Sequence, residues 1–195
     1  GAQPGSKPSQ PRHPGHESAV VLPDGTLSRI ERQVLGVARH RSELLAAGQH
    51  LKRGVLLYGP PGTGKTHTVR HLVGESPGTT VIVLAGGALR LVRLAAETAR
   101  ALQPAIIVLE DCDLIAEDRS FHDGPQPLLF EVLDAMDGLG SDSDVAFVLT
   151  TNRADLLERA LAQLPGRVAL AVEIPLPDST ARLRRVGLAR GARGG

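Results

Sequence analysis

One octet constrains this chain more than any other part of its sequence. Residues 59–66 read GPPGTGKT and match the pattern G-x-x-x-x-G-K-[ST]. The octet follows an apolar run at residues 55–58 and precedes a helical pattern, which is the context that a phosphate-binding loop requires. Gly62 and Gly64 allow the backbone N–H groups to face phosphate oxygens, next to the positive end of the following helix. A nucleotide-binding loop is therefore the prediction, and a chance Gly-rich turn is the disfavoured alternative.

The polar residues of the octet have a chemical reason to be there. Lys65 brings a positive charge to the β and γ phosphates, and the hydroxyl of Thr66 is a ligand for Mg²⁺. ATP and Mg²⁺ are accordingly the expected cofactors. The residues predicted to bind the nucleotide are Gly59, Pro60, Pro61, Gly62, Thr63, Gly64, Lys65 and Thr66.

Short apolar runs alternate with helical patterns along the chain. Such continuous apolar strands are typical of a parallel sheet with helices on both faces, so the predicted fold class is α/β. Ser28 and Glu31 have the spacing of a capping box and predict the start of a further, N-terminal amphipathic helix. The expected strands lie near residues 55–58, 81–84, 106–109, 145–149 and 169–174, and the expected helices near residues 65–73, 88–102, 128–136 and 154–161.

Composition favours one globular domain with tails. A chain of 195 residues with 42% hydrophobic residues can bury one substantial core. Residues 1–19 are rich in Pro, Gly and Ser and are expected to form a disordered linker, with the core domain at residues 20–178 and a basic, Gly-rich tail at residues 179–195. The chain starts with Gly1 instead of Met, which is consistent with a fragment of a longer protein.

Charge and residue usage argue against several classes of protein. A formal net charge of +1 gives no general reason to expect binding to nucleic acid or to an anionic membrane, and only the arginines after Ala181 would support DNA binding. Three Phe, one Tyr and no Trp offer no broad stacking platform for single-stranded nucleic acid. The lone Cys112 excludes an internal disulfide, and no run is apolar enough to span a bilayer. A soluble, cytoplasmic protein is the expectation.

Three further motifs follow the octet in order: the apolar-acidic segment after Pro104, LTTNR at residues 149–153 and LPGR at residues 164–167. Together the four motifs resemble an AAA+ ATPase, in particular the central-ATPase type seen in many bacterial members, over roughly residues 20–178. The resemblance implies the P-loop NTPase fold of the AAA+ large subdomain, a parallel five-stranded sheet in the order 5-1-4-3-2 with helices on both faces. It also implies ATP at the C-terminal edge of the strands and a homo-oligomeric, normally hexameric, ring with ATP between subunits.

The resemblance further implies roles for single residues. Glu110 matches the acid that organises the metal, together with Thr66, and Asp111 matches the base that activates the attacking water. Asn152 matches the residue that orients this water near the γ phosphate. Arg167 matches the second of two arginines offered to the neighbour's ATP, with a purely structural arginine as an equal alternative.

The order of the two acids departs from the family pattern, which is Asp followed by Glu. Here Glu110 comes first, so the base Asp111 is one methylene shorter and falls about 1 Å short of the water, which can cost on the order of a hundredfold in rate. Mg²⁺ tolerates the longer acid because it often keeps waters that bridge to the protein. A competing register puts Asp111 at the metal and Cys112 at the base position, but the spacing of Pro104 and Asp113 favours Glu110 first.

Three other departures concern the assembly. Leu164 stands where the family usually carries the first interface arginine, and the loss of such an arginine should lower turnover. In the threading members of the family, an aromatic loop that grips unfolded polypeptide lies between the second strand and the next helix. Here residues 85–88 lead almost directly into a helix and contain no aromatic residue, which argues against peptide threading. The tail at residues 179–195 corresponds to the start of a helical lid that the chain otherwise lacks. We therefore expect weak nucleotide retention and little stable ring formation by this chain alone.

Two functions are compatible with these motifs. The first is ATP binding with Mg-dependent hydrolysis at a slow basal rate, and the alternative is a switch that binds ATP and changes its protein contacts without meaningful hydrolysis. Asp113 is either a cap or loop residue or a catalytic acid. His67 and His71 have helical spacing compatible with a metal pair, but the sequence shows no nearby third ligand, so a metal site there is disfavoured.

Overall fold

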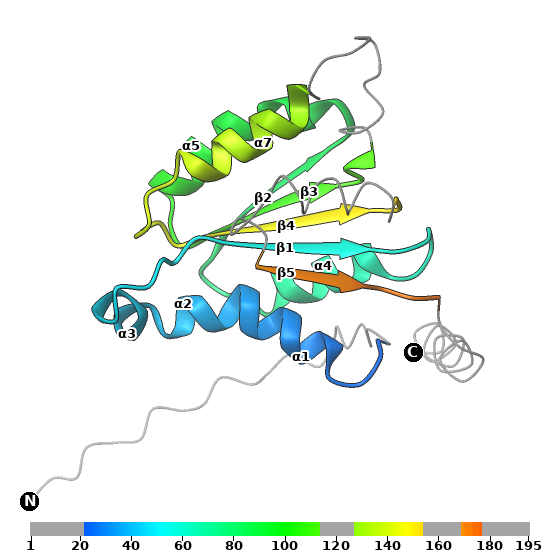
Figure 1. Ribbon diagram of the computed structural model, residues 1–195, viewed down its shortest axis with the longest axis horizontal. Coiled ribbons are helices and arrows are strands. Elements are labelled where there is room, and N and C mark those ends of the chain that lie inside the picture. The colour runs from blue at the N-terminus through cyan, green and yellow to red at the C-terminus, as the bar shows by residue number, and fades with distance from the viewer. Residues whose placement is uncertain (1–21, 114–126, 154–168, 177–195) are drawn as a thin grey trace, which may run out of the picture.

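The computed structural model describes residues 22–113, 127–153 and 169–176. Strands and helices alternate along these ranges as in a layered α/β domain (Figure 1). The strands are β1 (Arg53–Tyr58), β2 (Thr80–Ala85), β3 (Ala105–Glu110), β4 (Val145–Thr151) and β5 (Leu170–Glu173). The helices are α1 (Thr26–Glu31), α2 (Val37–Arg39), α3 (Arg41–Ala46), α4 (Lys65–Gly74), α5 (Val92–Ala101) and α7 (Pro127–Asp137), with a π-helical turn η1 (Arg32–Gly36) and a 3₁₀ turn η2 (Gly86–Leu91).

All five strands run parallel in one sheet, in the order β2-β3-β4-β1-β5. Read from the other edge this is 5-1-4-3-2, so the predicted fold class and strand order are confirmed. The strand β1 pairs with β4 on one side and β5 on the other, with Leu57 opposite Thr150 and Val172. Because β1, β3 and β4 are interior strands covered on both faces, they consist largely of apolar residues without polar alternation.

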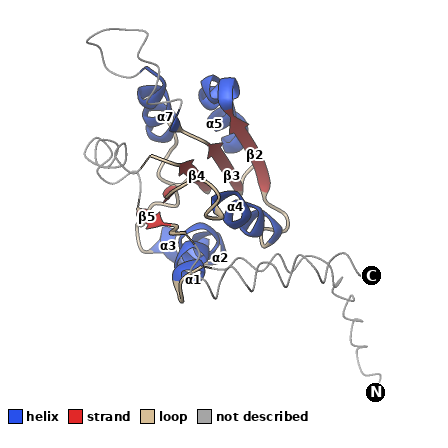
Figure 2. Ribbon diagram, turned by 90° about the vertical axis from the view of Figure 1, so that its right-hand side faces the viewer, coloured by secondary structure: helices blue, strands red, loops and turns tan. Residues whose placement is uncertain are grey.

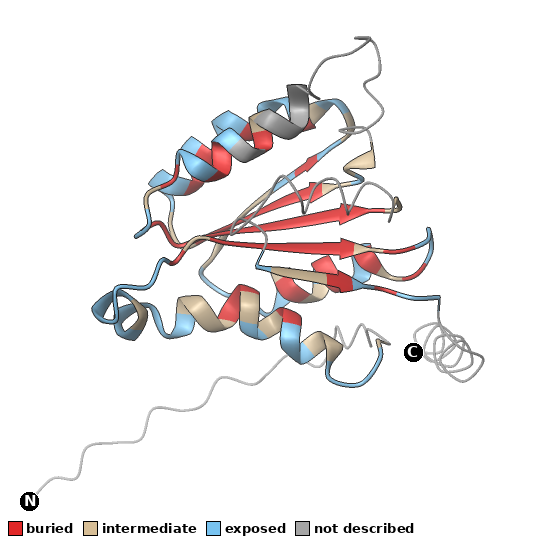
Figure 3. Ribbon diagram, viewed as in Figure 1, coloured by how far each residue is buried: buried red, intermediate tan, exposed pale blue. Residues whose placement is uncertain are grey.

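Helices cover both faces of this sheet (Figures 1 and 2). The helices α5 and α7 pack on one face over a core that includes Leu56 and Phe147. The elements α1, η1 and α4 cover the other face over a core that includes Val55 and Val148. Figure 3 shows the interior strands β1, β3 and β4 buried between these layers, while many outward positions on the helices are exposed. Successive residues of a strand therefore face different cores.

The N-terminal helix differs from its prediction. The sequence predicts one amphipathic helix capped by Ser28, but α1 already begins at Thr26, after Gly25 with a φ of 76°. Ser28 lies inside the helix, so the predicted capping role is wrong. The helix then widens into η1 and is interrupted at His40, where φ changes to −112°.

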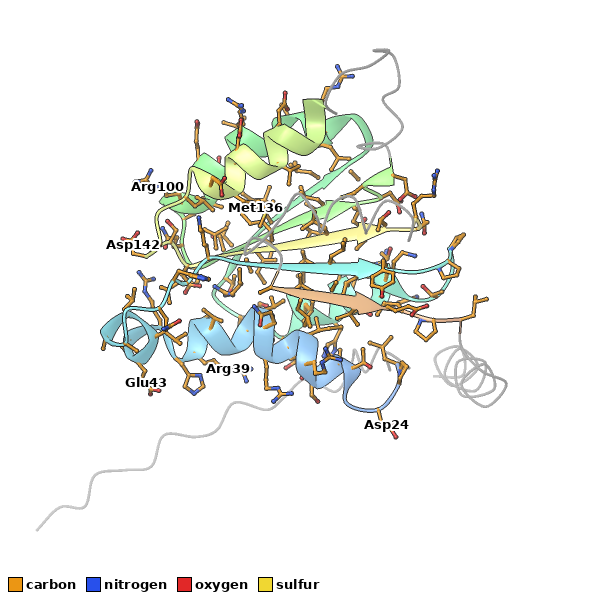
Figure 4. The ribbon with its side chains drawn as sticks, in the orientation of Figure 1. Asp24, Arg39, Glu43, Arg100, Met136 and Asp142 are labelled. Atoms are coloured by element: carbon orange, nitrogen blue, oxygen red, sulfur yellow. The ribbon has the colours of Figure 1, made fainter. Side chains whose placement is uncertain are left out.

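The buried side chain of Arg53 donates to a backbone carbonyl inside the π-helical turn η1. The Nε and Nη2 atoms of Arg53 donate to the carbonyl of Val34 at 2.9 and 2.7 Å. The Nη1 atom donates to the carbonyl of Leu51 at 2.8 Å and to the carboxylate of Asp144 at 2.6 Å. We call Arg53, Asp144 and these two carbonyls the amino-end cluster, since it lies where β1 and β4 begin, the end marked by Asp142 in Figure 4. It ties η1, β1 and the start of β4 together.

Several other predictions are refined by the structure. The helix predicted at residues 88–102 divides into η2 and α5, and β2 leads directly into η2, as the sequence of residues 85–88 indicates. The predicted helix at residues 154–161, the linker, the tail, Leu164 and Arg167 lie outside the described residues. Within the described ranges, no helix has the length and apolar character needed to cross a membrane.

Candidate nucleotide-binding site

The carboxyl ends of β1, β3 and β4 meet at one edge of the sheet, toward which all the strand arrows point in Figure 1. Residues 59–64 connect β1 to α4, residues 111–113 follow β3, and residues 152–153 follow β4. Open parallel sheets bind ligands outside the C-terminal ends of their strands. This edge is therefore the candidate site.

Three glycines shape the loop after β1. Gly59, Gly62 and Gly64 have φ values of 143°, 77° and 113°, which residues with a side chain rarely adopt. Space is also limiting at Gly59, because a Cβ atom there would lie 2.3 Å from the carbonyl oxygen of Ile174. The N–H of Ile174 donates to the carbonyl of Tyr58 at 2.7 Å. The loop therefore starts at a point where the end of β5 lies tightly against the end of β1.

Lys65 is the first residue of α4, and its side chain is folded under the loop. Its ammonium group donates to the carbonyls of Gly59 at 2.7 Å and Pro60 at 2.9 Å. Only 6% of the residue is exposed. Burial lowers the pKa of Lys65, while the charges of Asp111 and Asp113 partly raise it again. The loop thus holds a partly desolvated cation close to two carboxylates.

The chain turns sharply after β3. Glu110 is the last residue of the strand and pairs with Ala85 of β2. Asp111 then adopts a φ of 52°, a left-handed conformation that Asp tolerates better than most residues. Its N–H donates to the hydroxyl of Thr150 at 3.0 Å, and the N–H of Cys112 donates to the carbonyl of Thr150 at 2.8 Å. Thr150, near the end of β4, therefore holds the turn that redirects Asp111.

Glu110 and Cys112 face different sides of the sheet although they lie two residues apart, because β3 ends at Glu110 and the backbone turns at Asp111. Val108 faces the core under α4 and Leu109 faces the core under α5 and α7, so the two-residue period directs Glu110 toward the α4 side. Cys112 packs against the opposite core, and its thiol donates to the carbonyl of Leu109 at 3.3 Å. Burial raises the pKa of Cys112 to about 12. The thiol is protonated at neutral pH and is not suited to act as a base.

Asn152, directly after β4, contacts two carboxylates. Its Nδ2 donates to Oδ2 of Asp113 at 2.8 Å and, more weakly, to Oδ1 of Asp111 at 3.4 Å. The Oδ1 atom of Asp113 accepts from the backbone N–H of Asn152 at 3.0 Å and from the hydroxyl of Thr151. Burial by itself would raise the pKa of Asp113, but these hydrogen bonds and the charge of Lys65 hold it below its ordinary value. Asp113 is therefore an ionised acceptor at neutral pH.

The chemistry of this edge fits a nucleotide with Mg²⁺. The glycine-rich backbone and Lys65 offer donors to phosphate oxygens, and the N-cap of α4 is a glycine without a side chain to occupy the first helical N–H groups. Mg²⁺ in nucleotide sites is usually held by one or two carboxylates together with phosphates. Glu110 and the exposed Thr66 are the side chains that would hold it, and the carboxylate of Asp111 follows Glu110 directly in the chain.

The histidine pair is not arranged as a metal site. The Nε2 atom of His71 lies 2.7 Å from Oε1 of Glu31, so this contact joins α4 to α1. His67 is exposed one turn earlier on α4. In the part of the chain that the structure describes, no group of three or more His, Cys, Asp or Glu side chains could hold a metal ion by itself.

The sequence did not identify Thr150 or the link between Asp113 and Asn152. A partial signal was available, because Asp113 and Asn152 each come shortly after a buried apolar strand and Thr150 lies near the end of one of these strands. The pairing of Leu109 with Leu149 in parallel register brings these two polar segments side by side. Without the register, the partner of each polar residue could not be assigned.

The fold and this edge together define a P-loop nucleotide-binding protein of the α/β class. A family model described as "ATPase family associated with various cellular activities (AAA)" matches residues 55–176. The chain belongs to this family, and the resemblance to AAA+ ATPases noted from its motifs is confirmed.

The chain is similar to a protease regulatory subunit and to a proteasome-activating nucleotidase, among other proteins. The chain is 33% identical over 168 residues to the 26S protease regulatory subunit 6A of Caenorhabditis elegans, covering 80% of this chain and 39% of the relative. It is 40% identical over 144 residues to a proteasome-activating nucleotidase of Methanoculleus marisnigri, covering 67% and 35%. It is 33% identical over 167 residues to the ATPase family gene 2 protein homolog A of Homo sapiens, covering 79% and 18%. The chain thus spans less than two-fifths of the length of these relatives.

Proposed function

We propose that this domain binds ATP and hydrolyses it with Mg²⁺. The observation that carries the proposal is the convergence of three groups at the C-terminal edge of the sheet: the Lys65 ammonium, the Asp111 carboxylate and the Asn152 amide. Membership of an ATPase family supports it. When bound, Mg²⁺ would supply positive charge that stabilises the negative charge on the phosphate oxygens as it develops during the reaction.

Residues 59–66 would enclose the phosphates. The ammonium of Lys65, which now donates to the carbonyls of Gly59 and Pro60, is placed to donate to phosphate oxygens instead, and such charge-assisted hydrogen bonds are stronger than those to neutral carbonyls. Thr66 and Glu110 would hold the metal. The alternation that directs Glu110 toward α4 supports this assignment, because Thr66 lies in the first turn of that helix.

Asp111 is the proposed base, and Asn152 is the proposed residue that orients the water. The positive φ of Asp111 supports this role, since it turns the carboxylate to within 3.4 Å of the Asn152 amide and into the field of Lys65. Residues held in such conformations cluster at functional sites. Arg167 is proposed to act on a neighbour's ATP, by analogy with the family, with a structural role as the alternative.

Slow basal turnover is part of the proposal. Asp111 is a methylene shorter than the Glu of the family pattern, and a misplacement of about 1 Å can cost on the order of a hundredfold. Leu164 at the position of the first interface arginine removes a second contribution to phosphoryl transfer. A homo-oligomeric ring and a cytoplasmic location are proposed by analogy with the family.

The substitution Asp111→Asn tests the base. It keeps the size of the side chain but removes its basicity, so phosphate release should fall by roughly a hundredfold or more, while ATP affinity stays within about threefold. Phosphate release and equilibrium binding of ATP measure the two effects. The control is Asp134→Asn, an acid on α7 whose side chain is 63% exposed, and it should change neither. Unchanged turnover in Asp111→Asn would remove the assignment.

A single-turnover experiment separates hydrolysis from a switch. Protein in excess over ATP and Mg²⁺ should convert the bound ATP to ADP in one slow phase. If ATP is bound but no ADP forms over hours, the domain is a nucleotide-gated switch and the proposed hydrolysis is wrong.

A further inference from the structure

We propose that Asp113 is a positioning residue that fixes the orientation of the Asn152 amide, and through it the contact between Asn152 and Asp111. Asp113 thereby decides which atom of Asn152 is presented to the substrate. The kinetic part of this inference rests on the proposed ATPase activity, while the structural part does not.

Asp113 binds Asn152 at two separate points. Its Oδ1 accepts from the backbone N–H of Asn152 at 3.0 Å, and its Oδ2 accepts from the side-chain Nδ2 at 2.8 Å. The hydroxyl of Thr151 donates to the same Oδ1. Three donors from the end of β4 thus converge on one carboxylate, which is only partly exposed. Asp113 holds this segment at its backbone and at its side chain together.

Donor and acceptor chemistry then dictates the amide orientation. An ionised carboxylate only accepts hydrogen bonds, so two carboxylates beside one amide require its NH₂ group to face them. The Nδ2 atom of Asn152 faces both Asp113 and Asp111, at 2.8 and 3.4 Å. The carbonyl oxygen of Asn152 is therefore directed away from the acids. Asn152 would act on a water as a hydrogen-bond acceptor, while its NH₂ group restrains the proposed base.

The substitution Asp113→Asn probes this contact selectively. The hydroxyl of Thr151 and the N–H of Asn152 both need an acceptor, so they hold the carbonyl oxygen of an Asn side chain in the place of Oδ1. The substituted NH₂ group then replaces Oδ2 and opposes the NH₂ group of Asn152. We expect the Asn152 amide to turn over, which removes its correct presentation to the water and to Asp111.

A double-mutant cycle in turnover tests whether Asp113 acts through Asn152. Asp113→Asn should lower kcat on the order of ten- to a hundredfold, the effect of one hydrogen bond to a charged group, with KM for ATP within about threefold. In an Asn152→Ala background the same substitution should have no further effect on kcat. Effects that multiply would overturn the proposal, because Asp113 would then act independently of Asn152. Asp134→Asn is the matched control and should leave kcat unchanged in both backgrounds.

A nuclear magnetic resonance measurement tests the same contact without any hydrolysis. The side-chain NH₂ signals of Asn152, identified by their loss in Asn152→Ala, should shift in Asp113→Asn and stay in place in Asp134→Asn. In the unsubstituted protein, the NH₂ protons of Asn152 should exchange with water at least about tenfold more slowly than those of the exposed Gln49. Equal exchange rates, or Asn152 signals unaffected in a folded Asp113→Asn variant, would overturn the inference. Absence of ATP hydrolysis by the unsubstituted protein would instead overturn the proposed function and leave this test decisive.

Discussion

The sheet carries a charged cluster at each end, and the two clusters are built differently. At the start of the strands, the amino-end cluster joins Arg53 and Asp144, whose side chains are 4% and 3% exposed. At the other end, the carboxyl-end cluster consists of Lys65, Asp111, Asp113 and Asn152. Figure 4 labels Asp142, which lies at the end of the sheet where the strands begin, opposite the end to which the strand arrows point.

The hydrogen bonds show what each cluster is built for. Arg53 donates from all three guanidinium nitrogens to fixed acceptors, including an ionised partner that partly offsets the lowering of its pKa by burial. Among the residues that the structure describes, Lys65 donates to two neutral carbonyls, and the Asn152–Asp111 contact of 3.4 Å is long. We call the first cluster closed, because each Arg53 nitrogen has a fixed acceptor, and the second open, because the Lys65 ammonium donates to neutral carbonyls that a phosphate could replace. The closed cluster and the proposed binding groups thus lie at opposite ends of the same sheet.

The largest effect should come from breaking the closed cluster. Asp144→Ala leaves a buried guanidinium without its carboxylate, and breaking a buried pair in this way costs about 3–5 kcal/mol of unfolding free energy. Urea unfolding followed by circular dichroism measures this. The double variant Arg53→Met with Asp144→Leu removes both charges and should recover much of the loss. A loss below about 1 kcal/mol in Asp144→Ala would show that the amino-end cluster is not a stabilising element.

The second prediction removes a charged side chain from the open, carboxyl-end cluster. Lys65→Met removes a desolvated cation but keeps its aliphatic length, so the unfolding free energy should change by less than about 1 kcal/mol or increase. ATP affinity should fall roughly ten- to a hundredfold, because a charge-assisted contact to phosphate is lost. Isothermal titration with ATP and urea unfolding measure the two quantities. Arg70→Met, at an exposed position on the same helix, is the control. A large loss of stability in Lys65→Met would contradict the division of roles between the clusters.

The smallest effect should come from an ion pair that belongs to neither cluster. The Nη2 atom of Arg93 lies 3.0 Å from Oδ2 of Asp134 between α5 and α7, and both side chains are more than 60% exposed. Solvent screens such pairs, so Arg93→Ala should change the unfolding free energy by less than about 1 kcal/mol and leave ATP binding unchanged. The measurement sharpens the comparison because Arg53 and Asp144 form the same kind of ion pair, but a buried one. An effect as large as that of Asp144→Ala would mean that burial is not what distinguishes the two pairs.

Most of the sheet was predictable because its strands carry their own signal. Continuous apolar runs bounded by glycine, proline or polar residues locate all five strands to within two residues at each end. The phosphate-loop pattern locates the β1–α4 connection, and the family resemblance supplies the strand order. Local patterns are enough to predict an element when its residues alone determine where it begins and ends.

The N-terminal helix shows where local patterns fail. A turn at Gly25 starts the helix two residues before the predicted cap, and the side chain of Arg53 binds a carbonyl within η1 from outside the helix. Neither effect is encoded in the helical spacing of the apolar residues. The role of Asp113 is of the same kind, because it depends on a partner that strand register brings from 39 residues away. Long-range polar contacts of this type set the details that periodicity leaves open.

The contact between Gly59 and Ile174 connects the site to the order of synthesis. The last described strand, β5, completes the edge of β1 at the point where the phosphate-binding loop begins, although the two segments lie far apart along the chain. A nascent chain that has left the ribosome only as far as β4 has an open edge on β1 and no support behind that loop. A ligand that binds only the finished loop favours, by mass action, the chains in which β5 has docked. Nucleotide binding would in this way stabilise the chains whose sheet is complete, in addition to its role in the chemistry at the edge of the sheet.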